Sequence, residues 1–432
     1  MLSFAETLSD RERRHFRSIA IFAAVFGGFA TQIIENNSPV VLFLGMLNAS
    51  DSLAIFSTSL NGIASILLLI PGAALCARWG LRRTYTISSI GGSTAFLAIA
   101  LAPYFGAAAP YTVIGGTFVI GLSQTIYLAT WYPLLDNILK ADERSRFFAS
   151  MRFVYMIFMA LVLYALGKFL QSTPEMWLLQ TLFLAAAIAL WGRKFFMDRI
   201  PVSPDMRRES PDIRRSLDQC LRNRPLLGFS LYICFFYIIY ASVMPLALIY
   251  MKSYLGIAAG TIMILTSVNM VGKITGFFLI GRFAGFLNTR RMIIGTHFLT
   301  LITILILMAA LPSMKGYLPL IFGIAFFLLG IIYSSIGCIS SVEMLALAPA
   351  GSKIITMSFC MTAVAIGTAG GTLLSTGLIG CGALAETWYF MGLAVSKFQF
   401  IFAAGAAGMC YMLLLLPLVP AIIGRHNDYY RP

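Results

Sequence analysis

Residues 176–224 read MWLLQTLFLAAAIALWGRKFFMDRIPVSPDMRRESPDIRRSLDQCLRNR and change from apolar to charged character near residue 197. It begins with an apolar run over residues 176–196, and a helix needs about 20 such residues to cross the hydrocarbon core of a bilayer. A charged segment of mixed sign follows over 197–224. Such a pattern is typical of a solvated helical linker. We therefore interpret this stretch as a membrane span followed by a linker outside the membrane.

The composition extends this interpretation to the whole chain. Of its 432 residues, 59% are hydrophobic and only 11% are charged, with a mean hydropathy of +0.86. Soluble domains carry roughly 25% charged residues. The low charge content excludes a soluble enzyme, a nucleic-acid-binding protein and a disordered scaffold. We predict an all-α polytopic membrane protein whose surroundings are membrane lipids.

Apolar stretches of spanning length recur on both sides of the charged segment. The first is about 30 residues long, which exceeds the apolar core of a signal peptide and predicts an uncleaved first helix. We predict six spans before the charged segment and six after it: 18–47, 53–76, 84–104, 110–139, 147–170, 176–196, 225–250, 258–281, 291–312, 316–346, 354–380 and 397–424.

The basic residues give the orientation of these spans. Lys168, Lys252, Lys315 and Lys397 lie in connections on one side, Lys273 lies within a span, and the other Lys and Arg residues fall on the opposite side. Because basic residues concentrate on the cytoplasmic side, both termini are predicted to be cytoplasmic. The net charge of +14 is thus a topology signal, and no nucleic-acid partner is expected. Short outer loops favour a bacterial inner membrane.

The charged segment also divides the chain into similar halves. Arg78 recurs as Arg282, and the stretch 149–153 recurs as 355–359, at a common offset of about 204 to 206 residues. Internal duplication is a recurrent construction of transporters. We predict a six-helix bundle over 1–196, a cytoplasmic linker over 197–224 and a second six-helix bundle over 225–432.

The connection between the second and third spans carries a motif. It reads Ala73-Ala74-Leu75-Cys76-Ala77-Arg78-Trp79-Gly80-Leu81-Arg82-Arg83. With the arrangement of six plus six spans, it resembles the Gly-x-Leu-Ala-Asp-Arg-x-Gly-Arg-Arg-Arg motif of the major facilitator superfamily. Here Ala73 and Ala77 replace the opening Gly and the Asp, and in the family that Asp helps to latch the cytoplasmic gate. The resemblance implies a secondary transporter that works by alternating access.

The resemblance also implies a cytoplasmic gate built from charged residues near the ends of the spans. An acidic residue and a Glu-Arg pair often follow the fourth helix of the family, and Asp136, Glu143 and Arg144 match this pattern loosely. Ordinary charges that anchor helix ends are the alternative. The candidate gate residues are Arg78, Gly80, Arg82, Arg83, Asp136, Glu143, Arg144, Arg152 and Glu343.

Two charged residues are predicted to lie well inside the bilayer. Glu35 follows Arg17 by 18 residues and Lys273 precedes Arg282 by 9, which corresponds to about 27 Å and 14 Å along a helix. A charge in hydrocarbon costs at least ~2.5–3.5 kcal/mol, so such residues are usually functional. We expect Lys273 to bind an anionic group of a substrate. Glu35 is expected to carry the coupling proton, because low dielectric favours a protonated carboxyl group.

Alternatives to these two roles remain open. Glu35 and Lys273 could pair with each other or with the backbone as structural contacts between the halves, or Glu35 could coordinate a cation. Polar and aromatic side chains at helical spacing predict the walls of the binding site, although packing or an interfacial aromatic belt explains the aromatic residues as well. These candidates are Gln32, Asn36, Gln124, Tyr127, Trp131, Tyr237, Tyr240, Asn269 and Tyr333.

Other kinds of site find no support in the sequence. The 7 cysteines and 3 histidines are scattered, so no metal site, disulfide framework or catalytic triad is predicted. His297 is expected to be a hydrogen-bonded structural residue. We therefore predict that the protein is not an enzyme and has no cofactor, catalytic residue or metal.

The function predicted from the sequence is secondary active transport. The protein is expected to be a monomer that moves a small organic solute, anionic or zwitterionic, coupled to protons. One alternative is an exporter or flippase of lipids or amphiphilic compounds, which the aromatic, Met-rich interior favours. A second alternative is a receptor or scaffold on the same fold that transports nothing.

Overall fold

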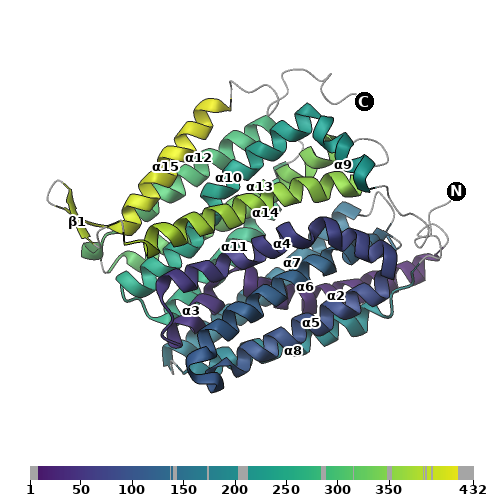
Figure 1. The fold of residues 1–432 in the computed structure, drawn as a ribbon, viewed down its shortest axis with the longest axis horizontal. Coiled ribbons are helices and arrows are strands. Elements are labelled where there is room, and N and C mark those ends of the chain that lie inside the picture. The colour runs from purple at the N-terminus through teal and green to yellow at the C-terminus, as the bar shows by residue number, and fades with distance from the viewer. Residues whose placement is uncertain are drawn as a thin grey trace. The chain divides into compact units, whose positions relative to one another are not determined.

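The structure is a computed structural model that consists almost entirely of helices (Figure 1). It describes residues 8–136, 138–139, 144–172, 175–202, 213–283, 289–314, 316–347, 353–382, 384, 387–390 and 393–416.

Every predicted span falls on a helix, and the first span is divided between two. The helices are α2 (Asp10–Glu35), α3 (Ser38–Met46), α4 (Asp51–Trp79), α5 (Leu81–Leu101), α6 (Ala109–Asp136), α7 (Arg144–Ser172), α8 (Met176–Met197), α9 (Ile213–Arg222), α10 (Arg224–Ile249), α11 (Ala259–Phe283), α12 (Thr289–Met308), α13 (Leu318–Ala346), α14 (Lys353–Gly380) and α15 (Lys397–Leu415).

Length and hydropathy identify 11 candidate membrane spans in the described residues. One of them, Leu81–Trp131, contains both α5 and most of α6. Gly106 separates these two helices, since its φ of 54° and ψ of −124° are not helical. The twelve predicted spans are therefore all accounted for, and the all-α polytopic fold is confirmed.

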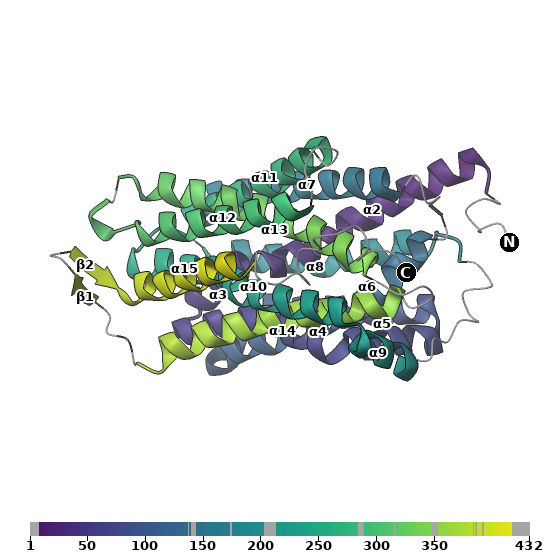
Figure 2. The same cartoon turned by 90° about the horizontal axis from the view of Figure 1, so that it is seen from above.

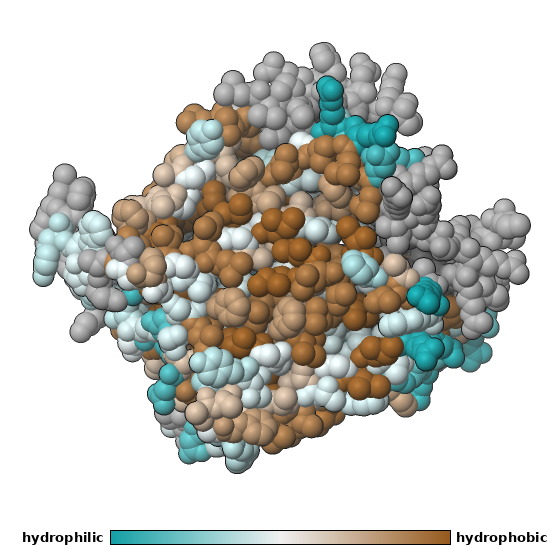
Figure 3. All heavy atoms as spheres, in the orientation of Figure 1, coloured by the Kyte–Doolittle hydropathy of each residue, from teal (hydrophilic) through white to brown (hydrophobic). Residues whose placement is uncertain are grey.

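The outward faces of these helices are apolar. Large apolar side chains lie exposed on several spans, among them Ile188, Leu231 and Phe278, which are 64%, 59% and 69% exposed. Figure 3 shows brown apolar side chains along the helices and teal hydrophilic ones near the helix ends. Such a surface is suited to contact with lipid rather than water.

The chain forms two compact units, which we describe separately. Unit 1 comprises Met1–Asn48, Leu60–Met159 and Glu175–Ile213, and unit 2 comprises Ala49–Ser59, Ala160–Pro174 and Arg214–Pro432. In unit 1, α5 packs against α6 and α8, and α8 packs against α2. In unit 2, α12 packs against α13 and α15, and α15 packs against α10. The order of helix contacts thus repeats, as expected for two pseudo-repeats.

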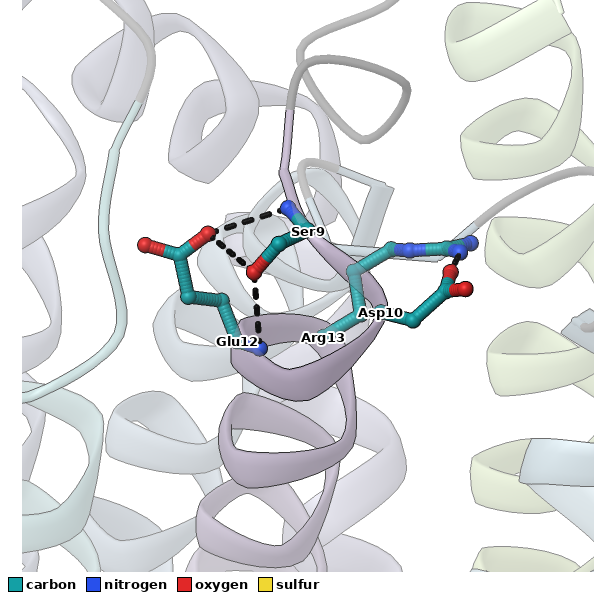
Figure 4. Close-up of polar contacts among 4 residues, drawn as sticks. All are labelled: Ser9, Asp10, Glu12 and Arg13. Carbon is teal, nitrogen blue, oxygen red and sulfur yellow. Dashed lines mark hydrogen bonds and ion pairs between the residues drawn. The ribbon is translucent and has the colours of Figure 1, made fainter.

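The start of α2 is fixed by its own side chains. Ser9 is the N-cap, and its hydroxyl accepts a hydrogen bond from the Glu12 backbone N–H at 3.3 Å. The Glu12 carboxylate in turn accepts from the Ser9 backbone N–H at 2.9 Å. Figure 4 shows this capping box beside the ion pair of Asp10 and Arg13. A capping box satisfies backbone donors that would otherwise lack partners at the start of the helix.

The first span differs from the single helix that was predicted. It breaks at Asn37, whose φ is 61°, and α3 then begins at Ser38 with Pro39 in its first turn. Asn tolerates a positive φ better than most residues, and Pro favours the first turn of a helix because it lacks an N–H. The first span thus consists of two helices, with Pro39 in the first turn of the second.

A short hairpin is the other departure from the predicted helical pattern. Strands β1 (Thr387–Phe390) and β2 (Leu393–Ser396) pair antiparallel between α14 and α15. They extend away from the helices at the start of α15 in Figures 1 and 2. The segment Thr387-Trp388-Tyr389-Phe390 is rich in residues that favour strands. Such a short run is hard to recognise beside the long apolar helices.

Candidate functional site

Lys273 is a buried residue of unit 2. Its side chain extends from α11, the residue is only 4% exposed, and its Nζ lies 4.4 Å from the centroid of the Tyr333 ring on α13. An ammonium group over an aromatic face is attracted by the ring quadrupole. The structure thus brings together two of the predicted binding residues.

Asn269 lies one helical turn before Lys273 and is 1% exposed. Its Nδ2 donates a hydrogen bond to the backbone oxygen of Phe326 at 2.8 Å. Because that partner is an acceptor, the amide must present its N–H₂ there, and the orientation of Oδ1 follows. Oδ1 is buried and has no hydrogen-bond partner among the described residues. A buried acceptor without a donor costs about 1–3 kcal/mol.

Close packing of α11 and α13 holds this pair in place. A Cβ atom added to Gly330 would lie 2.3 Å from the Asn269 backbone oxygen, and one on Gly272 would lie 2.1 Å from the Phe327 oxygen. Glycine is needed at both positions, since a side chain would force the helices apart. The backbone of Lys273 is also tied to α13, because Ser334 Oγ donates to its oxygen at 2.7 Å.

The predicted aromatic residues of α10 also lie together in unit 2. The rings of Tyr237 and Tyr240 are edge to face, with centroids 5.8 Å apart. Tyr240 donates a hydrogen bond from its hydroxyl to the backbone oxygen of Leu329 on α13 at 3.3 Å. These contacts place Tyr240 against the same helix that carries Tyr333.

Unit 1 contains a second polar and aromatic cluster, on α6. Tyr127 and Trp131 stack with centroids 5.7 Å apart, and the two residues are 7% and 5% exposed. The guanidinium carbon of Arg193 on α8 lies 3.8 Å from the Tyr127 ring centroid. Arg193 Nη1 donates to Gln124 Oε1 at 3.3 Å. Three predicted binding residues are therefore joined by one that the sequence analysis did not single out.

The position of Arg193 differs from the prediction, which placed this residue among the charges on the cytoplasmic side. It is 1% exposed. Counting basic residues near span ends gives topology but takes no account of where a side chain points. Here it points inward, since a Cβ on Gly27 of α2 would lie 2.7 Å from its Cδ. Arg193 lies four residues before the end of α8, and that position inside an apolar run was the available signal.

The predicted coupling residue Glu35 ends α2 just before the break. Its Oε2 accepts a hydrogen bond from Gln32 Nε2 at 2.6 Å. Asn36 Nδ2 donates to the Gln32 backbone oxygen at 2.6 Å, and Gln32 and Asn36 are 2% and 0% exposed. Gln32 is therefore hydrogen-bonded to both Glu35 and Asn36. The end of α2 thus carries one carboxylate, that of Glu35, beside the amide groups of Gln32 and Asn36.

The basic motif of the predicted gate contacts the end of α8 within unit 1. Asp198 accepts hydrogen bonds from Tyr85 Oη at 2.5 Å and Lys194 Nζ at 2.7 Å. Arg82 Nη2 lies 3.5 Å from the Asp198 backbone oxygen. Burial opposes the ionisation of Asp198, but these bonds and the nearby cations outweigh burial and lower the pKa of its carboxyl group. Asp198 thus supplies an acidic partner beside a motif whose own Asp is replaced by Ala77.

The gate candidates differ in their exposure to solvent. Arg78, Arg82 and Arg83 are exposed, and Gly80 has a φ of 82° at the turn between α4 and α5. Arg152 is partly buried and Glu343 is 5% exposed. Asp136 ends α6 and Arg144 begins α7, but their side chains, like the whole of Glu143, lie outside the described part of the chain.

His297 occupies a structural position in unit 2. Its Nδ1 lies 2.8 Å from the backbone oxygen of Ile293, and its Nε2 lies 3.1 Å from the hydroxyl of Tyr232. Donation from Nδ1 to that oxygen leaves Nε2 to accept from the Tyr232 hydroxyl. No group of three or more His, Cys, Asp or Glu residues in the described chain could hold a metal ion.

Comparison with solved structures shows which proteins share this fold. A mutant of the nucleoside transporter NupG superposes with a TM-score of 0.71 at 10% identity, covering 94% of this chain and 99% of that one. A D-xylose-proton symporter gives 0.69 at 17%, covering 95% and 98%. A POT family transporter in complex with 5-aminolevulinic acid gives 0.69 at 11%, covering 94% and 96%.

The sequence itself gives the family. No curated protein sequence matches the chain, but the family model described as Major Facilitator Superfamily matches residues 18–372. This match covers well over half of the chain, and the solved structures above share its fold. The chain is therefore a multi-pass membrane protein that belongs to the Major Facilitator Superfamily of transporters.

Proposed function

We propose that this protein is a secondary transporter that moves a small organic solute carrying an anionic group and a hydrogen-bond donor. The observation that supports this most directly is the pairing of Lys273 with Asn269 on one face of α11. Alternating access, implied by the family, would open the site in turn to each side of the membrane.

The role of Lys273 follows from electrostatics. Its ammonium group is buried and lies against the face of the Tyr333 ring. Low dielectric strengthens the attraction between an ammonium group and a carboxylate or phosphate group, so a buried lysine binds an anion more strongly than an exposed one does. We therefore assign the anionic end of the solute to Lys273.

The role of Asn269 follows from its unpartnered oxygen. Residues four apart on a helix have Cβ atoms about 5–6 Å from each other. A solute whose carboxylate binds Lys273 can therefore place an ammonium or hydroxyl group near Asn269 Oδ1 and satisfy it. Amino acids and hydroxy acids have this combination of groups, which makes the predicted zwitterionic or anionic solute more specific.

The coupling ion is proposed to be a proton carried by Glu35. Its carboxylate lies at the end of a membrane helix and accepts a hydrogen bond from Gln32. Neutralisation of this group by a proton would remove the cost of moving its charge through a low-dielectric interior. We further propose that both termini are cytoplasmic, that the membrane is a bacterial inner membrane and that the protein acts as a monomer.

A binding screen on the purified protein tests this function. The melting temperature is measured with L-alanine, L-lactate, 5-aminolevulinic acid, propionate, glucose and dodecylphosphocholine, because a ligand of the folded state raises it. The comparison uses Lys273→Ala and the matched control Lys168→Ala, which removes an exposed lysine 5.9 Å from the Tyr164 ring. We expect an amino or hydroxy acid to stabilise the parent and the control but not Lys273→Ala.

Two results would contradict the proposal. Stabilisation by anionic solutes that persists in Lys273→Ala would remove the lysine from the site. Stabilisation by the amphiphile alone, equal in both variants, would favour an exporter of amphiphilic compounds instead.

A further inference from the structure

We propose that Arg193 is a positioning residue for solute binding, which holds the Gln124 amide and the Tyr127 ring in their binding orientations. The inference rests on the proposed function, because Gln124 and Tyr127 are candidate residues of the solute site. It concerns a residue of α8 that no sequence motif marks.

The contacts of Arg193 fix the orientation of Gln124. Arginine only donates hydrogen bonds, so the atom of Gln124 that faces Nη1 at 3.3 Å must be its carbonyl oxygen. The N–H₂ group of Gln124 then points away from Arg193 and can donate to an acceptor such as a carboxylate. Without Arg193 the amide could rotate and exchange its donors for an acceptor.

The same guanidinium fixes the aromatic part of the cluster. It lies over the Tyr127 ring at 3.8 Å, and Tyr127 in turn stacks on Trp131. A second bond from Nη2 to Ser88 Oγ on α5, at 3.4 Å, holds the far end of the group. Arg193 thus connects α8 to α5 and α6 through three side chains.

Stability alone does not explain a cation in this position. Among the described residues the partners of Arg193 are neutral, and its buried Nε has no hydrogen-bond partner. A buried ion without an opposite charge is destabilising, and an apolar residue of similar volume often gives equal or higher stability. A structural role would therefore be served better by a residue such as Met.

Unit 2 contains a similar arrangement at the equivalent position. Tyr333 follows Tyr127 by 206 residues, the offset at which the two halves of the sequence repeat. Its ring also carries a buried cation, Lys273, at 4.4 Å. The two cations come from helices that are not equivalent, the sixth span for Arg193 and the eighth for Lys273. Each half thus has a cation over the equivalent tyrosine, although the two cations come from different helices. This recurrence favours a functional role for the contact between cation and tyrosine.

The first experiment needs no solute. In a protein that retains only Trp131, with Trp79, Trp177, Trp191 and Trp388 replaced by Phe, the fluorescence anisotropy of Trp131 reports how firmly the cluster is held. We expect Arg193→Gln to lower the anisotropy and to raise iodide quenching at least twofold. Arg199→Gln is the control, because Arg199 lies just beyond the end of α8, at 3.9 Å from the Phe195 ring, but is exposed. Unchanged fluorescence in Arg193→Gln would overturn the inference.

The second experiment uses the amino or hydroxy acid that stabilises the protein in the binding screen. In proteoliposomes we expect Arg193→Gln to raise KM about tenfold with little change in maximal rate, and Arg193→Lys to recover part of that loss. If Arg193 acts through Gln124, Gln124→Leu should add little to the KM of Arg193→Gln, as residues in one network are not additive. Additive effects on KM would overturn the positioning role. Solute binding that depends on Lys273 but not on Arg193 would leave the proposed function intact and reject this inference alone.

A third variant displaces the arginine without removing its charge, in case Arg193→Gln does not fold. Gly27→Ala adds a Cβ at 2.7 Å from Arg193 Cδ, whereas Gly115→Ala on α6 adds one with no atom within 4 Å. Alanine is otherwise the better helix former in both places. We expect raised KM and lower Trp131 anisotropy only in Gly27→Ala. The same values in both variants would count against the inference.

Discussion

Tyr127 and Tyr333 stand 206 residues apart in the sequence, and each has a buried cation over its ring, Arg193 at 3.8 Å and Lys273 at 4.4 Å. The two tyrosines lie on the fourth span of their respective halves, α6 and α13. A cation over an aromatic face gains about 2 kcal/mol or more when it is desolvated. For Arg193, whose described partners are neutral, burial of the charge costs several kcal/mol. This cost supports the positioning role proposed above.

The specificity of the unit 2 site can be tested with two solutes that differ by one hydroxyl. L-Lactate has a donor for Asn269 Oδ1 and propionate has none. We expect the parent protein to bind lactate about 10- to 100-fold more tightly, because a buried acceptor left without a donor costs about 1–3 kcal/mol. In Asn269→Leu the preference should disappear. Calorimetric titration measures both affinities, and equal binding of the two acids by the parent would contradict the assignment.

The packing of α11 against α13 predicts a steric effect at one glycine. Gly330→Ala places a Cβ 2.3 Å from the Asn269 backbone oxygen, so the helices must separate. We expect the free energy of unfolding to fall by about 1–3 kcal/mol, as is typical of overpacking. The control is Gly337→Ala on the same helix, where a Cβ meets nothing within 4 Å. Thermal unfolding in detergent compares the two, and equal melting temperatures would refute the close approach.

If Glu35 carries the coupling proton, Glu35→Gln should impair proton-driven uptake of solute but not exchange of solute across the membrane. Uptake driven by a pH gradient should fall at least tenfold, since the variant has no carboxyl group to carry the proton. Exchange of solute at equal concentration on both sides should persist. Glu12→Gln, at the exposed start of α2, is the control. A Glu35→Gln protein that still accumulates solute against its gradient would show that the proton is carried elsewhere.

The Asp198 cluster predicts a dependence of stability on pH. Lys194, Tyr85 and Arg82 lower the pKa of Asp198 below its usual value of 3.8 despite partial burial. A lowered pKa in the folded state means that the carboxylate contributes stability above about pH 4, and this contribution is lost as the pH falls through the folded value. Melting temperatures from pH 6 to pH 3 should therefore fall more in the parent than in Asp198→Asn. Asp218→Asn, which removes an exposed acid, should behave like the parent.

The number and approximate length of the spans were predictable from the sequence alone. An apolar run of about 20 residues crosses a bilayer as a helix, because every backbone N–H and C=O group in lipid needs a hydrogen-bond partner within the protein. The sequence also indicated Lys273 and Glu35, since a charge inside such a run is conspicuous. The exceptions were local. The break at Asn37 and the hairpin of β1 and β2 depend on a few residues whose preferences are weak beside the hydropathy signal.

Contacts between polar residues on different helices became known only from the folded structure. Gln124 and Tyr127 were recognised as a face of one helix, but nothing in their spacing shows that Arg193 reaches Gln124 from a helix 69 residues away. That contact requires Gly27 on a third helix to leave room for the arginine. Helical spacing describes neighbours on one helix only. Contacts between helices depend on how each helix is rotated about its axis and on the distance between the helices. Both are set by the packing of small residues such as Gly27 once the chain has folded.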